Sequence, residues 1–267
     1  MGTFFRDLMA LLDADMTTPT MYGWFHLMCL GVLFAALILT LIFFRKPSQK
    51  VTRRVLLICG IIMLLFEIYK QLNFSYDVVS ASWHYQWYAF PFQFCSTPMY
   101  IMLLAGLIKK GKLYNYLTAY LATYALLGGL LVMFYPSTVF VDTIGINIQT
   151  MVHHGLQVYV GLFLLLRGSV SNKLLTLRRA FIVFATLLAT ALLLNYLVPL
   201  AGVTDTFNMF FISPKYDCGL PVLNSIQQNV PYVVFLLIYA VAFTLGAWLM
   251  LLGDKLVCML RKKTTGK

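Results

Sequence analysis

The sequence predicts an all-α polytopic membrane protein with seven transmembrane helices, its N-terminus outside and its C-terminus in the cytoplasm. Composition is the first observation behind this fold class: 61% of the residues are hydrophobic, 11% are charged, and the mean hydropathy is +0.82. Ordinary soluble domains carry roughly 25% charged residues. The second observation is a series of apolar runs of bilayer length, and the third is an uneven distribution of positive charge between their loops.

Each apolar run is close to the ~20 residues that cross the ~30 Å hydrocarbon core of a bilayer. The predicted helices cover residues 22–44, 55–74, 89–108, 113–134, 147–166, 180–200 and 231–252. The segments between the runs are too short to build a second core, so we expect a single membrane domain over residues 1–267. Residues 1–20 lack the continuous apolar stretch of a signal peptide, and we expect them to form an interfacial N-terminal stub.

The loops carry the orientation signal. All of the 20 Lys and Arg residues except Arg6, Lys70 and Lys215 fall on one side of the predicted spans, where Asp254 is the only acidic residue. By the positive-inside rule, that side faces the cytoplasm. The formal net charge of +11 is therefore a topology signal. It also predicts attraction to anionic lipid at the cytoplasmic face, and it does not indicate nucleic-acid binding.

With this topology, the polar side chains of the spans lie in their outer halves, whereas the inner halves are Leu, Ile, Val and Phe. Polar and ionisable residues inside a membrane are costly and usually face the bundle interior, which makes them candidates for a functional site. We therefore predict a cup that opens outward or into the outer leaflet. The candidate residues are Cys95, His154, His26, Glu67, His153, Asn195 and Gln228.

The stretch 89–102 contains one thiol and two prolines inside a predicted span. Pro91 suits the first turn of a helix, whereas Pro98 removes a backbone donor and is expected to bend the helix beside Cys95. A buried free cysteine is usually an inert packing residue, and this interpretation stands beside that of a nucleophile. A third alternative is a disulfide between Cys95 and Cys218 on the outer side, which would leave no nucleophile.

The other candidates also have structural interpretations. Glu67 lies three residues from a lysine on the same helix face, so a local ion pair is an alternative to a catalytic carboxylate. His26 is equally well explained as an interfacial histidine. The adjacent His153 and His154 point about 100° apart on a helix, so at most one should face the cup squarely. We favour His154, because the neighbouring Gly155 permits close approach of another helix.

Several of these residues belong to short motifs. The segment PFQFCSTP resembles the PxxxC start of the third helix in YwaF-like bacterial membrane proteins. That family is similar to TMEM164-type eukaryotic proteins, which include an acyltransferase of ether phospholipids, and more distantly to androgen-induced-type lipid hydrolases. The match extends to His26, the pair His154 and Gly155, the pair Asn195 and Tyr196, and FNMFFISP at residues 207–214.

This resemblance implies Cys95 as a nucleophile and His154 as its base. A cysteine activated by histidine can take an acyl group from a lipid ester as a thioester and pass it to water or to a lipid hydroxyl. The hypothesis is a Cys/His lipid acyltransferase or lipid ester hydrolase in the bacterial cytoplasmic membrane. Its expected substrate is a phospholipid or another acyl lipid, and no cofactor is expected. His26, Asn195 and Gln228 are alternative donors to the developing oxyanion.

Two other function classes stay open. Metal binding would use His26, Glu67, Cys95 and His154, but no short ligand spacing supports zinc. A seven-helix binding protein, receptor or carrier for a small or lipidic ligand would also fit an outward cup. The last predicted helix contains no lysine, which argues against a retinal Schiff base. The scarcity of charges within the spans disfavours ion-coupled transport.

Overall fold

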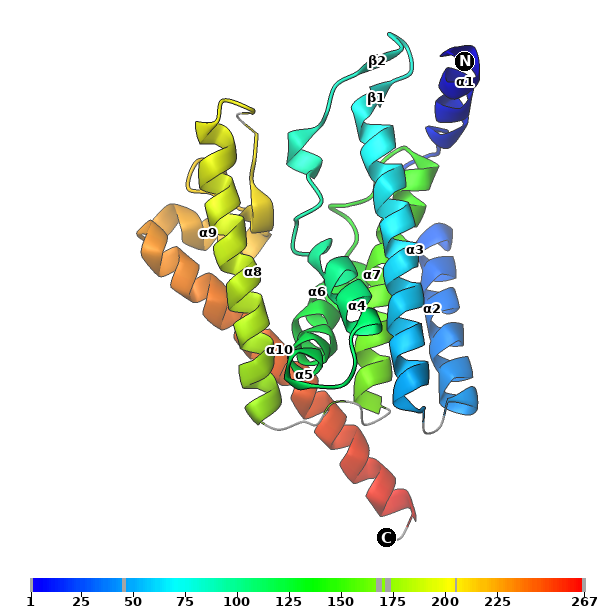
Figure 1. Cartoon of the computed structure of the whole chain (residues 1–267), viewed down its shortest axis with the longest axis vertical. Coiled ribbons are helices and arrows are strands. Elements are labelled where there is room, and N and C mark those ends of the chain that lie inside the picture. Colours follow the sequence, from blue (N-terminus) through cyan, green and yellow to red (C-terminus); the bar gives the residue numbers. More distant parts are fainter. Residues whose placement is uncertain (1, 45–46, 167–169, 171–173, 205, 266–267) are drawn as a thin grey trace.

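The computed structural model of the chain is mostly helical (Figure 1) and describes residues 2–44, 47–166, 170, 174–204 and 206–265. The long helices are α2 (Trp24–Phe43), α3 (Gln49–Ser75), α7 (Ile144–Leu166), α8 (Leu174–Leu200) and α10 (Tyr232–Thr265). A further continuous helical segment consists of α5 (Lys112–Tyr120), η2 (Leu121–Ala125) and α6 (Leu126–Phe134). The shorter elements are α1 (Gly2–Leu12), β1 (Tyr76–Asp77), β2 (Ser82–Trp83), η1 (Trp87–Ala89), α4 (Thr97–Leu107), η3 (Met209–Phe211) and α9 (Pro221–Asn229).

Among the described residues, five helical segments are long and apolar enough to cross a membrane. They are Trp24–Phe43, Gln49–Ser75, Lys112–Phe134, Leu174–Leu200 and Tyr232–Gly253. These segments correspond to the predicted spans 22–44, 55–74, 113–134, 180–200 and 231–252. The prediction of a helical, multi-pass membrane protein is therefore confirmed apart from the short strands β1 and β2, whereas the number of seven crossings and the orientation of the termini stay predictions.

The helix predicted over residues 89–108 is wrong in its first half. Residues 91–96 form turns, and α4 begins only at Thr97, with Pro98 in its first turn. Proline is well tolerated at that position, because the first-turn N–H groups have no partner inside the helix. Pro98 therefore starts a helix and does not bend one, and Cys95 lies just before the helix.

The helix predicted over residues 147–166 lies within α7, which has the required length of 23 residues. Its buried side chains include the amides of Asn147, Gln149 and Gln157 and two imidazoles, which lower its apolar character. Such a helix is stable inside a bundle, because its neighbours shield these groups from lipid. In Figure 1, α7 stands beside α2 and α3, with which it makes extensive contacts, and it also packs against α6.

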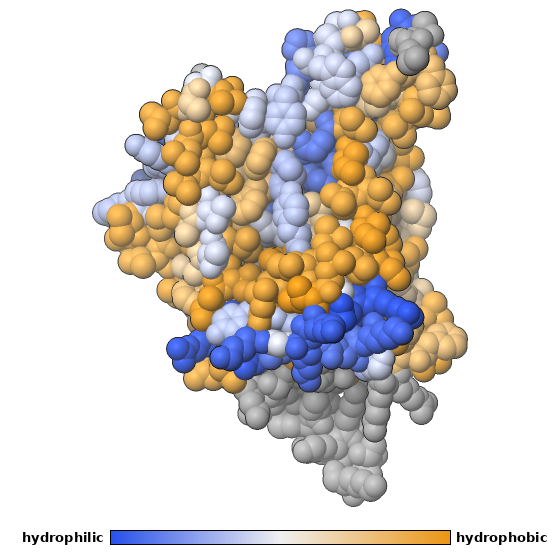
Figure 2. Space-filling model, in the orientation of Figure 1, coloured by the Kyte–Doolittle hydropathy of each residue, from blue (hydrophilic) through white to orange (hydrophobic). Residues whose placement is uncertain are grey.

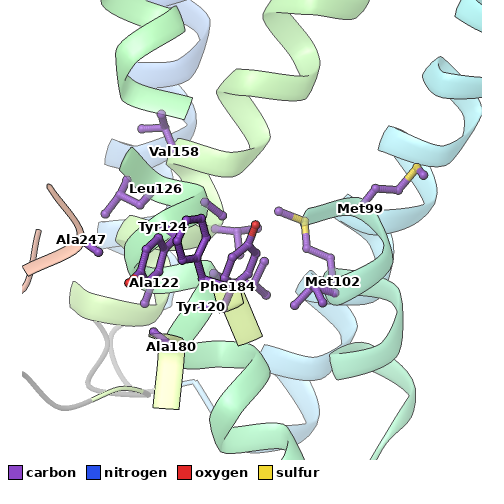
Figure 3. Close-up of a cluster of buried hydrophobic side chains, with 14 of the residues drawn as sticks. Met99, Met102, Tyr120, Ala122, Tyr124, Leu126, Val158, Ala180, Phe184 and Ala247 are labelled. Atoms are coloured by element: carbon purple, nitrogen blue, oxygen red, sulfur yellow. The ribbon is translucent and has the colours of Figure 1, made fainter. Parts of the chain in front are cut away.

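The centre of the molecule is an aromatic core (Figure 3). Tyr124 stacks on Phe184 of α8, with ring centroids 4.4 Å apart, and the Tyr124 hydroxyl lies 2.8 Å from the Thr244 hydroxyl of α10. Tyr124 belongs to η2, a π-helical turn between α5 and α6. The wider turn packs against α7 at Gly161, where an added Cβ would meet Leu126 Cβ at 2.6 Å. This turn therefore joins α8 and α10 to α7.

Hydrophilic residues gather in a band at the lower edge of the molecule in Figure 2, below an apolar middle region. In this part of the structure, Arg53 donates hydrogen bonds to the carbonyls of Gly106 (3.2 Å) and Leu107 (2.6 Å). An arginine is favourable there, because the last carbonyls of a helix lack partners and carry partial negative charge. Five of the charged residues used to predict the orientation lie outside the described residues, namely Arg45, Lys46, Arg167, Lys173 and Lys267.

Candidate functional site

The Cys95 segment is attached to α7 by a hydrogen bond from a buried amide. Gln157 Nε2 donates to the carbonyl oxygen of Cys95 across 2.9 Å. The preceding carbonyl, that of Phe94, accepts from the Thr97 hydroxyl at 3.0 Å, which replaces the helical partner that Pro98 cannot supply. The backbone beside the thiol is therefore satisfied from two directions, although it is not helical.

The adjacent histidines of α7 have different partners. His153 Nε2 lies 2.8 Å from the carbonyl oxygen of Met63 on α3, whereas His154 Nδ1 lies 2.7 Å from the carbonyl oxygen of Thr150 on its own helix. Since a carbonyl can only accept, both nitrogens carry the proton in these contacts. Nε2, at the outer end of the ring, is then the basic nitrogen of His154. For His153 the basic nitrogen is Nδ1, next to the helix backbone.

Glu67 and Lys70 form a buried ion pair, with Lys70 Nζ 2.7 Å from Glu67 Oε1 and side-chain exposures of 13% for the lysine and 3% for the glutamate. The local ion pair considered from the sequence is thus present. Gln71 donates to the same carboxylate oxygen at 2.9 Å and to the carbonyl of Ala89 at 2.7 Å. The C-terminal part of α3 is therefore connected to the segment that leads to Cys95.

These charges act on both candidate catalytic groups. Lys70 and Glu67 lie within electrostatic range of the Cys95 sulfur, and Lys70 also lies within range of the His154 imidazole. The Lys70 ammonium group favours the thiolate form of Cys95, whereas burial and the Glu67 carboxylate oppose it. One polar region therefore lies between three parts of the structure, namely α3, α7 and the turns that precede α4.

Three buried polar atoms of this region have no hydrogen-bond partner within the described chain: Glu67 Oε2, Ser96 Oγ and Gln157 Oε1. Ser96 follows Cys95, and Gln157 contacts its carbonyl. Buried polar groups are nearly always paired, and an unpaired one is costly. Two of the three atoms thus belong to residues that are next to Cys95 in sequence or bonded to its backbone, so this polar region keeps unused hydrogen-bonding capacity.

His26 lies away from this region and serves as a connector between helices. Its Nδ1 accepts from the Tyr22 backbone N–H at 2.9 Å, and its Nε2 lies 2.8 Å from the Met133 carbonyl oxygen at the end of α6. Both ring nitrogens are thus occupied by backbone groups. The ring is fully buried, so it is not an exposed interfacial histidine.

Asn195 and Gln228 are also engaged elsewhere. Asn195 holds the backbone of Met209 from both sides, accepting from its N–H at 2.6 Å and donating to its carbonyl at 2.9 Å. Gln228 is exposed on α9, where its amide lies 3.5 Å from the Asn224 side chain on the same helix. Within the described part of the chain, no hydrogen bond places Asn195 or Gln228 beside Cys95.

Gln93 is an organising residue that the sequence interpretation missed. It accepts from the Phe210 N–H at 3.0 Å and donates to the Asn208 carbonyl at 3.0 Å. This pair of bonds joins the two motifs PFQFCSTP and FNMFFISP. The available signal was a glutamine two residues before Cys95 in an otherwise apolar stretch.

The segment that Gln93 holds has an unusual backbone. Phe210 and Phe211 have φ values of 59° and 56°, in the left-handed region that non-glycine residues rarely adopt. Phe210 is fully buried, and its carbonyl accepts from the Tyr239 hydroxyl at 3.0 Å. Such backbone strain persists only where surrounding contacts enforce it, and it is common near functional sites.

Two alternatives for the thiol receive no support. Cys95 and Cys218 are both free, with no disulfide between them. Among the described residues, no group of three His, Cys, Asp or Glu side chains is placed to hold a metal ion.

The sequence profile of the TMEM164 family matches residues 21–252, which include every candidate site residue. No curated protein and no solved structure matches the chain. The expected relationship to TMEM164-type proteins is confirmed, whereas the links to YwaF-like proteins and to androgen-induced-type hydrolases stay predictions. Because the match covers well over half of the chain, and because its helices are apolar and long enough to span a bilayer, the protein belongs to the TMEM164 family of multi-pass membrane proteins.

Proposed function

We propose that the protein is a membrane-embedded lipid acyltransferase or lipid ester hydrolase, with Cys95 as nucleophile and His154 as general base. The observation that carries the proposal is the contact between Gln157 and the Cys95 carbonyl. Gln157 lies three residues after His154, so both side chains occupy neighbouring positions on one face of α7. The backbone of Cys95 is thereby held close to the turn of α7 that carries His154, which supports pairing the two residues.

The proposed first step forms a thioester. His154 Nε2 takes the thiol proton, and the sulfur attacks the carbonyl carbon of a lipid ester. The carbon–oxygen bond to the glycerol oxygen then breaks, and His154 returns the proton to that oxygen, which leaves as an alcohol. The hydrogen bond from Nδ1 to the Thr150 carbonyl supports this role, because it keeps Nε2 as the basic nitrogen in the neutral ring.

In the second step, water or a lipid hydroxyl attacks the thioester while His154 accepts its proton. The carbon–sulfur bond breaks, and the proton returns to the sulfur. Lys70 is the proposed stabiliser of negative charge in both steps, because its charge reaches the thiol region. Glu67 holds this ammonium group in place. His26, Asn195 and Gln228 are not proposed as oxyanion donors, since their hydrogen bonds lie elsewhere.

The test uses the full chain in lipid nanodiscs with a phospholipid labelled in its acyl chains. We expect release or transfer of labelled acyl groups by the wild-type protein and by Cys218→Ala, a matched loss of a buried thiol. Cys95→Ala and His154→Ala should both abolish it. Wild-type turnover in the Cys95→Ala and His154→Ala variants would disprove the proposed chemistry.

A binding protein or carrier for a lipidic ligand is the second candidate. It is favoured by an apolar groove of about 400 Å³ between α2 and α7, which does not include Cys95. Lipid binding or transfer between vesicles that persists in Cys95→Ser, without any acyl release by the wild-type protein, would favour this function.

A further inference from the structure

One face of α7, away from the face that carries Gln157, borders an open apolar groove. This face carries Ile148, Val152, Gly155 and Tyr159, which recur at helical spacing, whereas Gln157 points toward Cys95. The opposite wall is α2, from Phe25 to Ala36. The groove is therefore separate from the candidate catalytic region.

The length of the groove matches one leaflet of a bilayer. From Phe25 to Ala36, and equally from Ile148 to Tyr159, eleven residue steps of ~1.5 Å give about 17 Å. This is roughly half of the ~30 Å hydrocarbon core. An acyl chain of one leaflet spans the same depth.

A hydrogen bond between helices lies near each end of the groove. At one end, His26 of α2 contacts the carbonyl of Met133, which itself lines the groove. At the other end, the hydroxyls of Thr40 and Tyr159 lie 2.8 Å apart and join α2 to α7. The first bond joins α2 to α6 and the second joins α2 to α7, while the space between α2 and α7 stays open over about 400 Å³.

The side of the groove is open to the membrane. Met28 and Val32 line it and are 51% and 65% exposed, so they face the surrounding lipid. The floor at Gly155 has room, because an added Cβ would meet only the Met133 side chain, at 3.9 Å. Methionine side chains adapt readily to ligands of irregular shape. A chain can therefore enter sideways from the bilayer.

We propose that this groove holds one acyl chain of a phospholipid from the leaflet on the α1 side of the molecule. The occupant follows from the apolar lining, the one-leaflet length and the opening toward lipid. A soluble apolar ligand is disfavoured, because the opening faces the bilayer. This binding does not depend on the chemistry proposed for Cys95, so either proposal can fail without the other.

The experiment uses the full chain in nanodiscs that contain a phospholipid with a photoactivatable diazirine in the middle of one acyl chain. After irradiation, peptide mapping should place adducts on Met28, Cys29 and Leu156 well above those on Val241 and Leu245. The latter two are exposed residues of α10 and report contact with bulk lipid. Equal labelling of the groove and of α10 would overturn the proposal.

Gly155→Leu supplies the second arm, because its side chain fills the open floor. Adducts in the groove should fall roughly tenfold, the change expected when about two methylene groups leave the site. Adducts on α10 should be unchanged. Gly31→Leu is the matched control, since Gly31 lies on α2 outside the groove with nothing within 4 Å of an added Cβ. If Gly155→Leu also alters α10 labelling, Ala36→Leu provides the same filling from the opposite wall, and unchanged groove adducts in that variant would contradict the proposal.

Discussion

Gln157 of α7 donates a hydrogen bond to the Cys95 carbonyl across 2.9 Å, while its other amide atom, Oε1, is buried without a partner among the described residues. This contact positions the turns before α4. The amide contributes little net stability, because its nitrogen makes a hydrogen bond whereas its buried oxygen makes none among the described residues. We therefore expect Gln157 mainly to position the Cys95 backbone and only weakly to stabilise the fold.

Gln157→Leu should lower turnover strongly with little effect on stability. The substitution removes the bond to Cys95 but also removes an unpaired buried oxygen, so we expect the free energy of unfolding to change by only about 1 kcal/mol. Acyl release should fall at least roughly tenfold, because small misplacements of a nucleophile are costly. Unfolding in detergent and labelled-lipid turnover measure the two effects, with Gln228→Leu on the exposed face of α9 as the control. A loss of stability that fully explains the loss of turnover would contradict the positional role.

Lys70→Met should destabilise the protein by about 3 kcal/mol, because it leaves the Glu67 carboxylate buried without its cation. The double variant Glu67→Gln/Lys70→Met removes both charges and should recover most of that loss. Chemical unfolding of the single and double variants provides the comparison. A double variant no more stable than Lys70→Met would show that the buried charge is not the cause.

Gln93→Leu should loosen the segment from Asn208 to Phe211. The Phe210 N–H and the Asn208 carbonyl would both lose their partner, at a cost of about 2 kcal/mol. Hydrogen exchange at Met209 and Phe210 should accelerate, since their strained backbone depends on such contacts. Gln86→Leu, which loses only an exposed bond to the His84 carbonyl, is the matched control. Equal exchange rates in the two variants would argue against the role of Gln93.

Gly161→Ala should destabilise the protein by about 1–3 kcal/mol, because the new methyl group would lie 2.6 Å from Leu126 Cβ and 3.1 Å from the Leu121 carbonyl oxygen. Gly31→Ala has open space and should be neutral or slightly stabilising, since alanine favours a helix. The unfolding temperature should therefore fall in Gly161→Ala, whereas in Gly31→Ala it should stay unchanged or rise slightly. A similar downward shift in both would contradict the close approach at Gly161.

Hydropathy predicted the long spans well, because lipid imposes a strict requirement for apolar length. It was less informative where polar residues are buried inside the bundle, as in α7. The start of α4 was missed because Pro98 suits both a kink and a first turn, and only tertiary contacts decide between them. Here those contacts join the Thr97 hydroxyl to the Tyr120 hydroxyl and the Gln157 amide to the Cys95 carbonyl.

Among the candidate site residues, some contacts could be predicted from the sequence and others could not. The Glu67–Lys70 pair could be predicted, since both residues lie on one helical face. The roles of His26 and Asn195 could not, because each binds a backbone group distant in sequence or in a loop. A single sequence does not distinguish a polar side chain that hydrogen-bonds to the backbone from one that contacts a ligand. Gln93 was missed for this reason.

The most direct test of the central claim is covalent trapping of the acyl group. The wild-type protein in nanodiscs is incubated briefly with acyl-labelled phospholipid, denatured in acid and mapped by mass spectrometry. We predict a hydroxylamine-sensitive acyl group on Cys95, absent in Cys95→Ala and strongly reduced in His154→Ala. Acyl transfer that proceeds in Cys95→Ala, or an acyl group found only on another residue, would contradict the account.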